Sequence, residues 1–523
     1  MVAGSFRIPR VVAAPMEPRG LIAEYDAEAD LLTILISAQD PHRPHAQLAE
    51  ALGRPAESVR VVLPDVGGAF GSKGAIGPEI VAVAAAALRL GGPLKWAEDR
   101  YENFVGAYQG RGIEADVELA VSADGAFLGL RARIHADLGA YLYATTAVAA
   151  HTTAMLITGT YVIPAAEVEL VGAATTKVPT GPYRGAGRPE AAYLIERMVD
   201  QAARELALDP IELRRRNFIR HDAFPYDTPM GWTYDSGDYE RCLDRALDLA
   251  ELDRWRAERE RGRRIGIGVG MLVERSGGQW ESAAVRLEDD GRVVVRTGAS
   301  PHGQGHETTF AQIAADELGV DPALVEVHWG DTLAGPAGVG TFASRSTAMA
   351  GSALLEALRE LKARGTKEAE ARFSSGLLFS SGAYVAVVEV DEATGALELL
   401  RLVAVDDAGR IVNPLLAHGQ VIGATAQGLG AVLVEEVVHD ESGQPVTASF
   451  ADYGLLTAWE MPEVAAAFVE TPSPLNPLGA KGIGEGGSIG APAAVANAVV
   501  DALGGAHLDP PFTEEKVWEA LQP

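Results

Sequence analysis

The sequence is poor in cysteine, in positive charge and in long apolar runs. Its 523 residues include one cysteine, Cys242, which excludes a disulfide within the chain and an iron–sulfur cluster held by the chain's own thiolates. Lysine and arginine total 44 against 72 aspartates and glutamates, and the formal net charge of −28 disfavours nucleic acid and anionic membrane surfaces as partners. No uncharged apolar stretch reaches the length of a membrane span.

The first residues carry no sign of a secretory signal. Residues 1–7 lack the basic start and the apolar run that such a signal needs, so the expected location is cytoplasmic, unless a partner subunit carries an export signal. Cys242 lies in a segment of helical character, which favours a packed core thiol over a reactive one.

Length and hydrophobic content predict several domains of mixed structure. A chain of 523 residues with 47% hydrophobic content exceeds what one core usually holds. Strands and helices alternate irregularly, which predicts a mixed α/β arrangement of the α+β class. The expected elements are strands at 31–37 and 59–63, hairpins at 114–135 and 385–405, a buried alanine-rich helix at 79–90, and amphipathic helices at 189–208 and 239–261.

One pattern recurs in the two halves of the chain. Residues 37–63 and 300–328 each contain a loop with Pro-His-x-x-His or Pro-His-x-x-x-His spacing, then a helix that ends in Leu-Gly, then a strand. The repeat indicates two related subdomains, 1–225 and 226–523, and a chance match of a few positions is the alternative. Clefts between subdomains are common ligand sites.

Glu485 stands in a loop of unusual glycine content, from Gly479 to Gly490, that leads into an alanine-rich helix. Glycines at 484, 486 and 487 have no Cβ, so backbone and ligand can approach this acid closely. A solvated surface loop has no need of so much glycine around one glutamate. The arrangement favours a general base held against a bulky cofactor.

Four further loops combine many glycines with few charges. Exposed backbone N–H groups beside a few polar side chains suit a large polar ligand with phosphates. Two of the loops contain Arg184 and Arg345, whose small uncharged neighbours favour contact with an anion over a surface salt bridge. The loops cover residues 65–73, 181–190, 302–307 and 338–346.

Standard nucleotide and metal patterns fit poorly. Residues 67–73 do not complete a P-loop, and prolines at 472, 474 and 477 stand where a dinucleotide fold needs a strand before the Gly-x-Gly-x-x-Gly match at 482–487. A nicotinamide dehydrogenase is therefore a weak alternative. His42 with His45, and His302 with His306, have no cysteine nearby to complete a metal site, so loop hydrogen bonds are the favoured interpretation.

Taken together, the loops resemble the molybdenum hydroxylase family, the large subunits of the xanthine dehydrogenase, aldehyde oxidase and carbon monoxide dehydrogenase type. The blocks follow family order from near residue 7 to the C-terminus, which makes the match specific. They are Ala38-Gln-Asp-Pro-His, Pro64-Asp-Val-Gly-Gly-Ala-Phe-Gly-Ser-Lys, Tyr183-Arg-Gly-Ala-Gly-Arg-Pro-Glu, Ser300-Pro-His-Gly-Gln-Gly-His-Glu-Thr-Thr, Gly340-Thr-Phe-Ala-Ser-Arg-Ser and Gly479-Ala-Lys-Gly-Ile-Gly-Glu-Gly-Gly.

The resemblance implies two similar subdomains that embrace a molybdopterin cofactor, in the cytosine dinucleotide form usual in bacterial members. Molybdenum would be held through the pterin and not by side chains. Glu485 matches the family's catalytic glutamate, the general base in oxidising an aldehyde or heterocycle with oxygen from water. By position, the cofactor contacts are Gln39, Phe70, Arg184, Gln304 and Ala343, with Gly68, Gly305, Ser344 and Arg345 as backbone or phosphate neighbours.

The family passes electrons through two iron–sulfur centres and FAD. Because this chain has one cysteine, it cannot hold those clusters. The resemblance therefore implies an iron–sulfur subunit and an FAD-binding subunit as partners, with a small-molecule substrate and no nucleic acid or membrane.

Three departures qualify the resemblance. Gly185 stands where carbon monoxide dehydrogenases carry a copper-binding cysteine, and Gly74 where xanthine dehydrogenases carry a substrate-binding glutamate, so both activities are disfavoured. The chain is also short: residue 7 already aligns with the molybdenum-binding region, and a segment is expected to be missing between Ala353 and Tyr384, where 362–381 has the pattern of a brief link. Either a separate chain supplies the N-terminal domain, or the protein is a non-catalytic cofactor-binding or assembly subunit. Intact Glu485 and Arg184 favour the enzyme.

Overall fold

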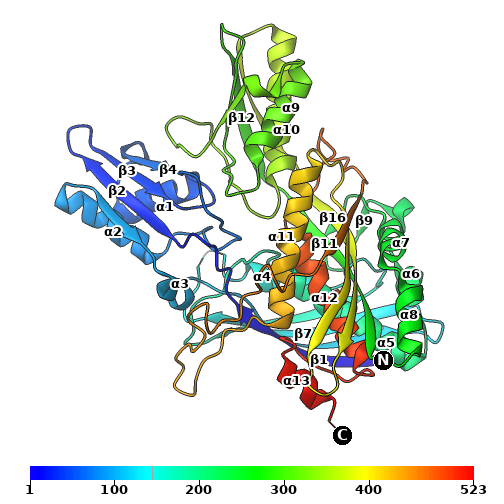
Figure 1. Ribbon diagram of the computed structural model, residues 1–523. Helices are drawn as coiled ribbons and strands as arrows, with labels where there is room; N and C mark the ends of the chain where they lie inside the picture. The colour runs from blue at the N-terminus through cyan, green and yellow to red at the C-terminus, as the bar shows by residue number, and fades with distance from the viewer. Residues whose placement is uncertain (144, 523) are drawn as a thin grey trace.

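The body of the molecule contains two four-stranded sheets. The computed structural model describes residues 1–143 and 145–522, and its helices and mixed sheets confirm the α+β class (Figure 1). The first body sheet has the order β1-β6-β7-β8 and the second β11-β16-β17-β18. Their strands are Val2–Val11 (β1), Gly110–Val121 (β6), Phe127–Gly139 (β7), Ala166–Ala174 (β8), Ile265–Gly277 (β11), Leu377–Val390 (β16), Leu397–Asp407 (β17) and Val464–Val469 (β18).

A small lobe is inserted after the first strand of each body sheet. In Figure 1 the blue lobe with β2 to β5 and the green lobe around β12 stand apart from each other on the body. Each lobe has its own apolar core. The first lobe comprises Gly20–Asp26 (β2), Leu31–Ile36 (β3), His42–Leu52 (α1), Val59–Val62 (β4), Pro78–Leu90 (α2) and Leu94–Ala97 (β5). The second comprises Trp280–Leu287 (β12), Val293–Thr297 (β13), His306–Leu318 (α9), Val325–His328 (β14), Ser346–Arg364 (α10) and Glu368–Ser374 (β15).

The two halves of the chain repeat one topology. The lobe sheets have the orders β4-β3-β2-β5 and β14-β13-β12-β15, and each contains one parallel pair, β3 with β4 and β13 with β14. Each body sheet is antiparallel except for its last strand, which is parallel to the third. The helices α1 and α9 both end at a left-handed glycine, Gly53 with φ 62° and Gly319 with φ 70°. The recurring sequence pattern thus marks a structural repeat, and the exact boundary at residue 225 stays a prediction.

Two helices of the body lie at its centre and contact each other. The helix α5 (Arg188–Leu206) packs on β1, β6 and β11, and α12 (Gly486–Ala502) packs on β11 and β16. Glycines at alternate positions of β11 allow this approach, since a Cβ at Gly270 would stand 2.6 Å from the carbonyl oxygen of Gly490 on α12. Small residues on α12 complete the fit, which places the loops before α5 and α12 side by side.

Most elements expected from the sequence are present, with three corrections. Strands β3 and β4, helix α5 and both hairpins, β6–β7 and β16–β17, are confirmed. The helix expected at 239–261 is two helices, α7 (Tyr239–Ala250) and α8 (Leu252–Glu260), because Glu251 between them adopts φ 55°. The helix α2 is only half-buried, and residues 362–381 form the end of α10, β15 and the start of β16 where a link was expected. Cys242 is buried on α7 as expected.

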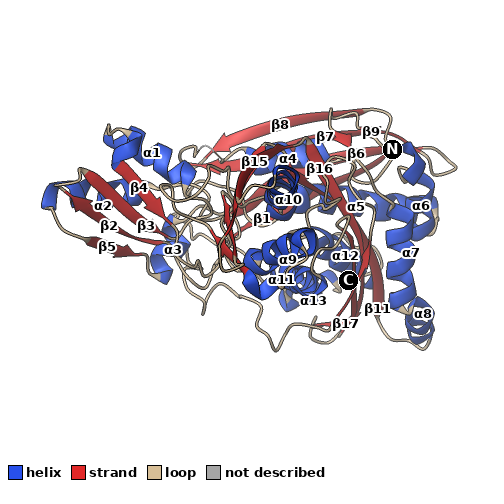
Figure 2. Ribbon diagram, turned by 90° about the horizontal axis from the view of Figure 1, so that it is seen from above, coloured by secondary structure: helices blue, strands red, loops and turns tan. Residues whose placement is uncertain are grey.

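The remaining elements complete the body. They are Arg100–Gly106 (α3), Val148–Leu156 (α4), Pro210–Asn217 (α6), Tyr226–Asp227 (β9), Thr233–Tyr234 (β10), Pro414–Leu433 (α11) and Glu514–Ala520 (α13), with short 3-10 turns at 56–58, 221–223 and 322–324. Seen from above in Figure 2, the first lobe extends to one side of the body. No helix in the described chain is long and apolar enough to cross a membrane, and the cytoplasmic location stays a prediction.

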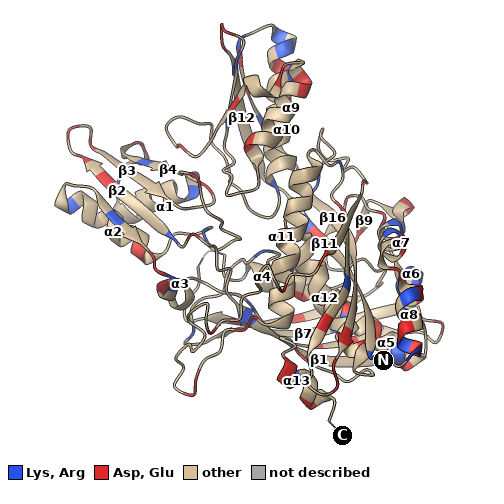
Figure 3. Cartoon of the chain, viewed as in Figure 1, with Lys and Arg blue, Asp and Glu red and all other residues tan. Residues whose placement is uncertain are grey.

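Charge is concentrated at the periphery. In Figure 3, charged residues gather on α6, α7 and α8 and at the ends of the lobes, whereas α11 in the middle carries none. This helix contributes no Lys, Arg, Asp or Glu side chain, and its Gln420 is one of the polar residues that line the cavity described below.

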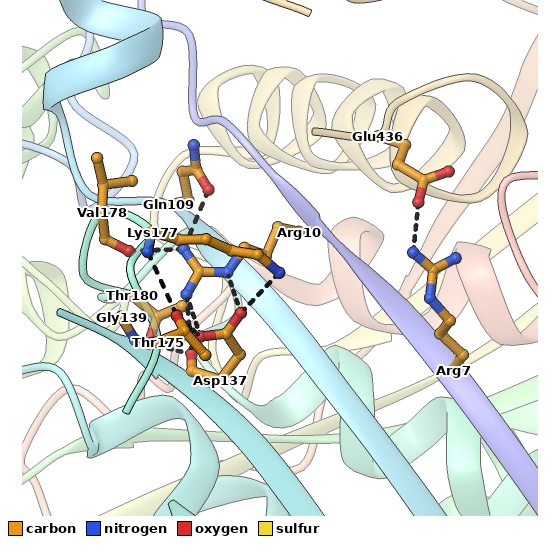
Figure 4. Close-up of polar contacts among 10 residues, drawn as sticks. All are labelled: Arg7, Arg10, Gln109, Asp137, Gly139, Thr175, Lys177, Val178, Thr180 and Glu436. Atoms are coloured by element: carbon orange, nitrogen blue, oxygen red, sulfur yellow. Dashed lines mark hydrogen bonds and ion pairs between the residues drawn. The ribbon is translucent and has the colours of Figure 1, made fainter. Parts of the chain in front are cut away.

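A cluster of ion pairs links two strands of the first body sheet to the segment that leads to the Arg184 loop. Arg10 at the end of β1 donates from Nε to Oδ2 of Asp137 on β7 at 3.1 Å, and Lys177 Nζ lies 3.0 Å from the same oxygen (Figure 4). Arg10 also donates to the carbonyl of Val178 at 2.6 Å. The segment that leads to Arg184 is thereby tied to both strands.

Candidate active site

One cavity lies where the body meets both lobes. Its volume is about 930 Å³, and the predicted base Glu485 lies on its wall. The wall also includes eight of the nine predicted cofactor residues, namely Gln39, Gly68, Phe70, Arg184, Gln304, Ala343, Ser344 and Arg345. Gly305 is not on the wall: it precedes α9, and its α-carbon faces Leu416. Loops scattered over the whole sequence therefore converge on a single space.

Backbone conformation makes several of these loops suited to anions. Phe70, Ala343 and Ser344 are not glycines, yet they adopt φ of 51°, 49° and 48°, and Gly68 has φ 92°. Left-handed residues in turns aim successive N–H groups to one side and form concave sites for anions. Such conformations cost about 1–3 kcal/mol each and cluster at ligand sites. The donor set fits a cofactor with phosphates.

Each lobe contributes one of the two predicted glutamines. Gln39 of the first lobe donates from Nε2 to the carbonyl of Thr341 at 3.0 Å, which links it to the loop before α10. Gln304 of the second lobe accepts the His302 N–H at Oε1 at 2.7 Å. Gln39 is thus held by a neighbouring loop and Gln304 by its own loop, and both residues line the cavity.

Arg184 joins the loop before α5 to the Glu485 loop. Its Nε donates to the carbonyl of Gly484 at 2.5 Å, and Nη2 donates to the carbonyl of Gln420 on α11 at 3.1 Å. The guanidinium lies over the ring of Phe70, 5.6 Å from its centroid. Its Nη1 donates to Oε1 of Gln427 at 3.2 Å, so the guanidinium is held by uncharged acceptors, and among the described residues no carboxylate forms an ion pair with it.

Arg345 behaves differently from the expectation. Its side chain is fully buried in an ion pair with Glu281, and it also donates to the carbonyl of Gly340 at 2.8 Å. The anion that this guanidinium contacts is thus the carboxylate of Glu281, which contradicts a phosphate contact through the side chain. Any contribution of Arg345 to the cofactor would come from its backbone and from the loop shape it fixes.

Glu485 is held at both carboxylate oxygens. Oε1 accepts the backbone N–H of Gly185 at 2.8 Å and lies 3.4 Å from Arg188 Nη1, and Oε2 accepts the hydroxyl of Ser344 at 3.0 Å. The residue precedes α12, where the helix dipole favours negative charge. Burial by itself would raise the pKa of Glu485, but Arg188, the Gly185 N–H and Ser344 outweigh it and lower the pKa. The carboxylate is ionised and stays 9% exposed at the cavity wall.

Two residues of this site were not singled out from the sequence. Arg188 donates from Nη1 to the carbonyl of Gly185 at 2.6 Å and so fixes the turn whose N–H meets Glu485. Glu274 on β11 is buried beside them. Arg188 belongs to the motif at residues 183–190 that carries the family resemblance, and Glu274 is visible in the sequence as a charge within an apolar strand.

The histidine pairs serve the loops. His45 Nε2 lies 2.9 Å from the carbonyl of Ala56, and His302 Nε2 lies 2.9 Å from Gln304 Nε2. Among the residues that the structure describes, no three His, Cys, Asp or Glu side chains gather in a metal-binding arrangement. These contacts match the interpretation that the paired histidines form hydrogen bonds within the loops.

Comparison with known proteins identifies the family. Residues 1–218 match a molybdopterin cofactor-binding domain, and residues 243–376 and 368–462 match a second domain of that description. The carbon monoxide dehydrogenase large chain of Hydrogenophaga pseudoflava is 35% identical, over 98% of this chain and 74% of that protein. The chain belongs to the molybdenum hydroxylase family. This molybdenum hydroxylase subunit is a molybdopterin-dependent oxidoreductase.

Other members are similar over nearly the whole chain. A subunit of the 6-hydroxypseudooxynicotine dehydrogenase complex of Paenarthrobacter nicotinovorans is 35% identical, over 97% of this hydroxylase subunit and 72% of that protein. The crystal structure of quinoline 2-oxidoreductase from Pseudomonas putida 86 superposes with a TM-score of 0.96 at 33% identity, covering 99% of this chain and 76% of that one. The alignment with the carbon monoxide dehydrogenase spans 591 positions, more than the 523 residues here, so that relative has residues within the aligned region that this chain lacks; a gap between Ala353 and Tyr384 stays a prediction.

Proposed function

We propose that this subunit oxidises a small aldehyde or heterocycle, with oxygen derived from water and Glu485 as the general base. The observation that carries the proposal is one ionised, ligand-facing carboxylate on the wall of a cavity of about 930 Å³. A cavity of this size holds a cofactor with room for a small substrate. The quinoline and 6-hydroxypseudooxynicotine relatives carry heterocyclic compounds in their names, which supports the substrate class.

In this proposal the chain's own residues orient the base and move a proton. Gly185 and Arg188 hold Oε1 of Glu485, and Ser344 holds Oε2, so the carboxylate needs no reorganisation before it accepts a proton. General-base help of this kind is worth about 10²–10⁴-fold in rate. When bound, molybdopterin with molybdenum would supply the redox chemistry by taking the electron pair from the substrate.

The cofactor would be held from both lobes and the body. We assign contacts to Gln39, Phe70, Arg184, Gln304 and Ala343, and backbone support to Gly68, Ser344 and, indirectly, Gly305 and Arg345. The left-handed loops on the cavity wall suit a ligand with several phosphates, so the cytosine dinucleotide is the proposed form.

The proposed partners are an iron–sulfur subunit and an FAD-binding subunit. One buried cysteine cannot ligate a cluster, so electrons must leave through other chains. The relatives are named as a large chain and as a complex subunit, which supports such an assembly. The division of the chain at residue 225 is part of the proposal.

Carbon monoxide oxidation with copper is disfavoured at this site. Gly185 has φ 100°, and a Cβ there would collide with the ring of Pro189. A cysteine at this position would also disturb the N–H that Glu485 accepts. The loop is built to hold the carboxylate and not to present a thiolate.

Metal content tests the proposal first. Elemental analysis of the chain, purified from its native host with bound partners, should give about one molybdenum per chain if one cofactor site is filled. Wild-type protein should then turn over an aldehyde or heterocycle from a screen, whereas Glu485→Gln should not. No metal, in cells whose other molybdoenzymes are loaded, would instead favour a non-catalytic assembly subunit.

A further inference from the structure

A second buried carboxyl lies next to the proposed base. Glu274, near the end of β11, is 1% exposed, and its Oε1 has no hydrogen-bond partner in the part of the chain that the structure describes. A Cβ at Gly482 would stand 2.6 Å from this oxygen and 2.8 Å from the Cβ of Ser344. Glu274 therefore borders the Glu485 loop three residues before the base.

Ser344 lies between the two acids. Its hydroxyl donates to Oε2 of Glu485 at 3.0 Å, while the same side chain borders the pocket left by Gly482 in which Oε1 of Glu274 lies. A hydroxyl both donates and accepts a proton. It can therefore connect two carboxyl groups that do not contact each other directly.

A third acid, Asp406, lies beyond Glu274 and extends the row formed by Glu485, Ser344 and Glu274 away from the cavity. Asp406 on β17 is buried and accepts the hydroxyl of Tyr384 at Oδ2 at 2.9 Å. A Cβ at Gly486 would collide with Oδ1 of Asp406 and stand 3.8 Å from Oε2 of Glu274. The absence of a side chain at 486 thus lets Asp406 and Glu274 approach across the first residue of α12.

The surrounding charges do not balance three ionised acids. Arg188 is committed to Glu485 and to the carbonyls of Gly185 and Arg275, and no ion pair reaches Glu274 or Asp406 among the described residues. Neighbouring carboxylates in a buried site cannot all ionise, so such groups share protons. Three arginines, Arg184, Arg188 and Arg275, and one acid, Asp406, face Glu274 and Glu485. Asp407 and Tyr384 in turn face Asp406.

We propose that Glu274 is a positioning residue that holds the proton shared with Glu485, keeps Glu485 ionised, and passes a proton toward Asp406 when Glu485 becomes protonated. This inference rests on the role proposed for Glu485. The expected protonation states agree with it: burial, then repulsion from Glu485, raises the pKa of Glu274 to about 8, and burial raises the pKa of Asp406 to about 7.

The proton balance is simple. Glu485 gains one proton in the reaction, and Ser344 accepts it while donating its own hydroxyl proton to one oxygen of Glu274. Glu274 releases the proton it already held from its other oxygen to the unprotonated carboxylate of Asp406. Glu485 and Glu274 together then hold one proton again, Asp406 has gained one, and no electron moves in this step.

Infrared titration of the isolated chain tests the shared proton without the cofactor. The carbonyl stretch of protonated carboxyl groups should persist in wild type at neutral pH and fall as pH rises toward about 10. Glu274→Gln should lose the part of this band that titrates near the Glu274 value. Glu435→Gln is the matched control, because Glu435 is another buried carboxyl with pKa raised by burial to about 7 but lies outside this row. An unchanged titration in Glu274→Gln would overturn the shared proton.

Kinetics then test the relay in the loaded complex. Glu274→Gln should lower kcat by about 10- to 100-fold, near the low end of acid–base effects, and remove the alkaline limb of the pH profile. Glu274→Asp, which keeps a carboxyl, should restore a titrating band and part of kcat. A wild-type profile in both variants would overturn the relay while leaving Glu485 in place. Full turnover in Glu485→Gln would instead remove the proposed function.

Discussion

The backbone N–H of Gly185 donates to Oε1 of Glu485 at 2.8 Å, although the two residues are 300 positions apart. The contact joins the loop before α5 to the loop before α12. It also explains a glycine with φ 100° at a place where any side chain would meet Pro189.

Substituting Gly185 should therefore damage the site more than backbone strain predicts. Gly185→Ala combines a left-handed residue with a collision, so we expect a loss of about 2–3 kcal/mol in the free energy of unfolding. Gly262→Ala is the control: Gly262 has φ 96° but open space around it, and it should cost about 1 kcal/mol. Thermal melting of both variants measures the difference, and equal losses would contradict the collision.

Removing the charge of Glu485 should abolish chemistry and leave the cofactor in place. In Glu485→Gln we expect turnover to fall about 10²–10⁴-fold, because the amide cannot accept the proton. Molybdenum content, measured in parallel, should match wild type. Unchanged turnover would remove Glu485 from the mechanism.

Arg184 should be needed for the protein to bind its cofactor. Arg184→Ala removes a buried charge that no carboxylate of the described chain pairs, so cofactor occupancy should fall about tenfold or more, as expected for a charged hydrogen-bonding group. Arg131→Ala, at an exposed ion pair on the outer sheet, should keep full occupancy. Full molybdenum content in Arg184→Ala would refute its assigned contact.

The buried pair of Arg345 and Glu281 should carry stability rather than ligand affinity. Both side chains are 0% exposed, and Glu281→Gln would leave the guanidinium without its counter-ion, at a cost of about 3–5 kcal/mol. Glu118→Gln, in an exposed pair with Arg131, should cost less than about 1 kcal/mol. Denaturant unfolding distinguishes the two, and a mild effect of Glu281→Gln would show that the pair is dispensable.

The lowered pKa of Asp137 predicts that its contribution to the free energy of unfolding depends on pH. Burial would raise its pKa, but the Thr175 hydroxyl, Arg10 and Lys177 outweigh burial and lower the pKa to about 2. The folded protein then binds fewer protons here than the unfolded chain, so the advantage of wild type over Asp137→Asn is complete above about pH 4 and lost toward about pH 2. We expect about 1 kcal/mol at neutral pH, since the site is partly exposed. A difference independent of pH in urea unfolding would rule out this account.

Local chemistry explains what the sequence could predict. The glycines around Glu485 and the left-handed caps at Gly53 and Gly319 are visible in the chain itself, and so is the period-two pattern of the hairpins. Loop order supported the family, and with it most of the cavity wall. These signals lie within a few residues of the features they predict.

Partners far apart in the chain explain what was missed. Glu281 lies 64 residues before Arg345, and nothing near either residue indicates that the guanidinium is already paired. Glu274 meets the Glu485 loop only because β11 packs on α12. The helix break at Glu251 depends on a left-handed residue other than glycine, which propensity does not predict.

The paired helices α5 and α12 fix the proposed base in the core of the body. Arg197 on α5 donates to Oδ1 of Asn497 on α12 at 2.8 Å, and Asn497 donates to the carbonyl of Val269 on β11 at 2.9 Å, all inside one apolar core. The base and its holding arginine, Arg188, begin these helices, whereas Gln39 and Gln304 belong to lobes with cores of their own. The base is thus fixed by the core of the body, whereas the two glutamines are carried by lobes that are packed separately.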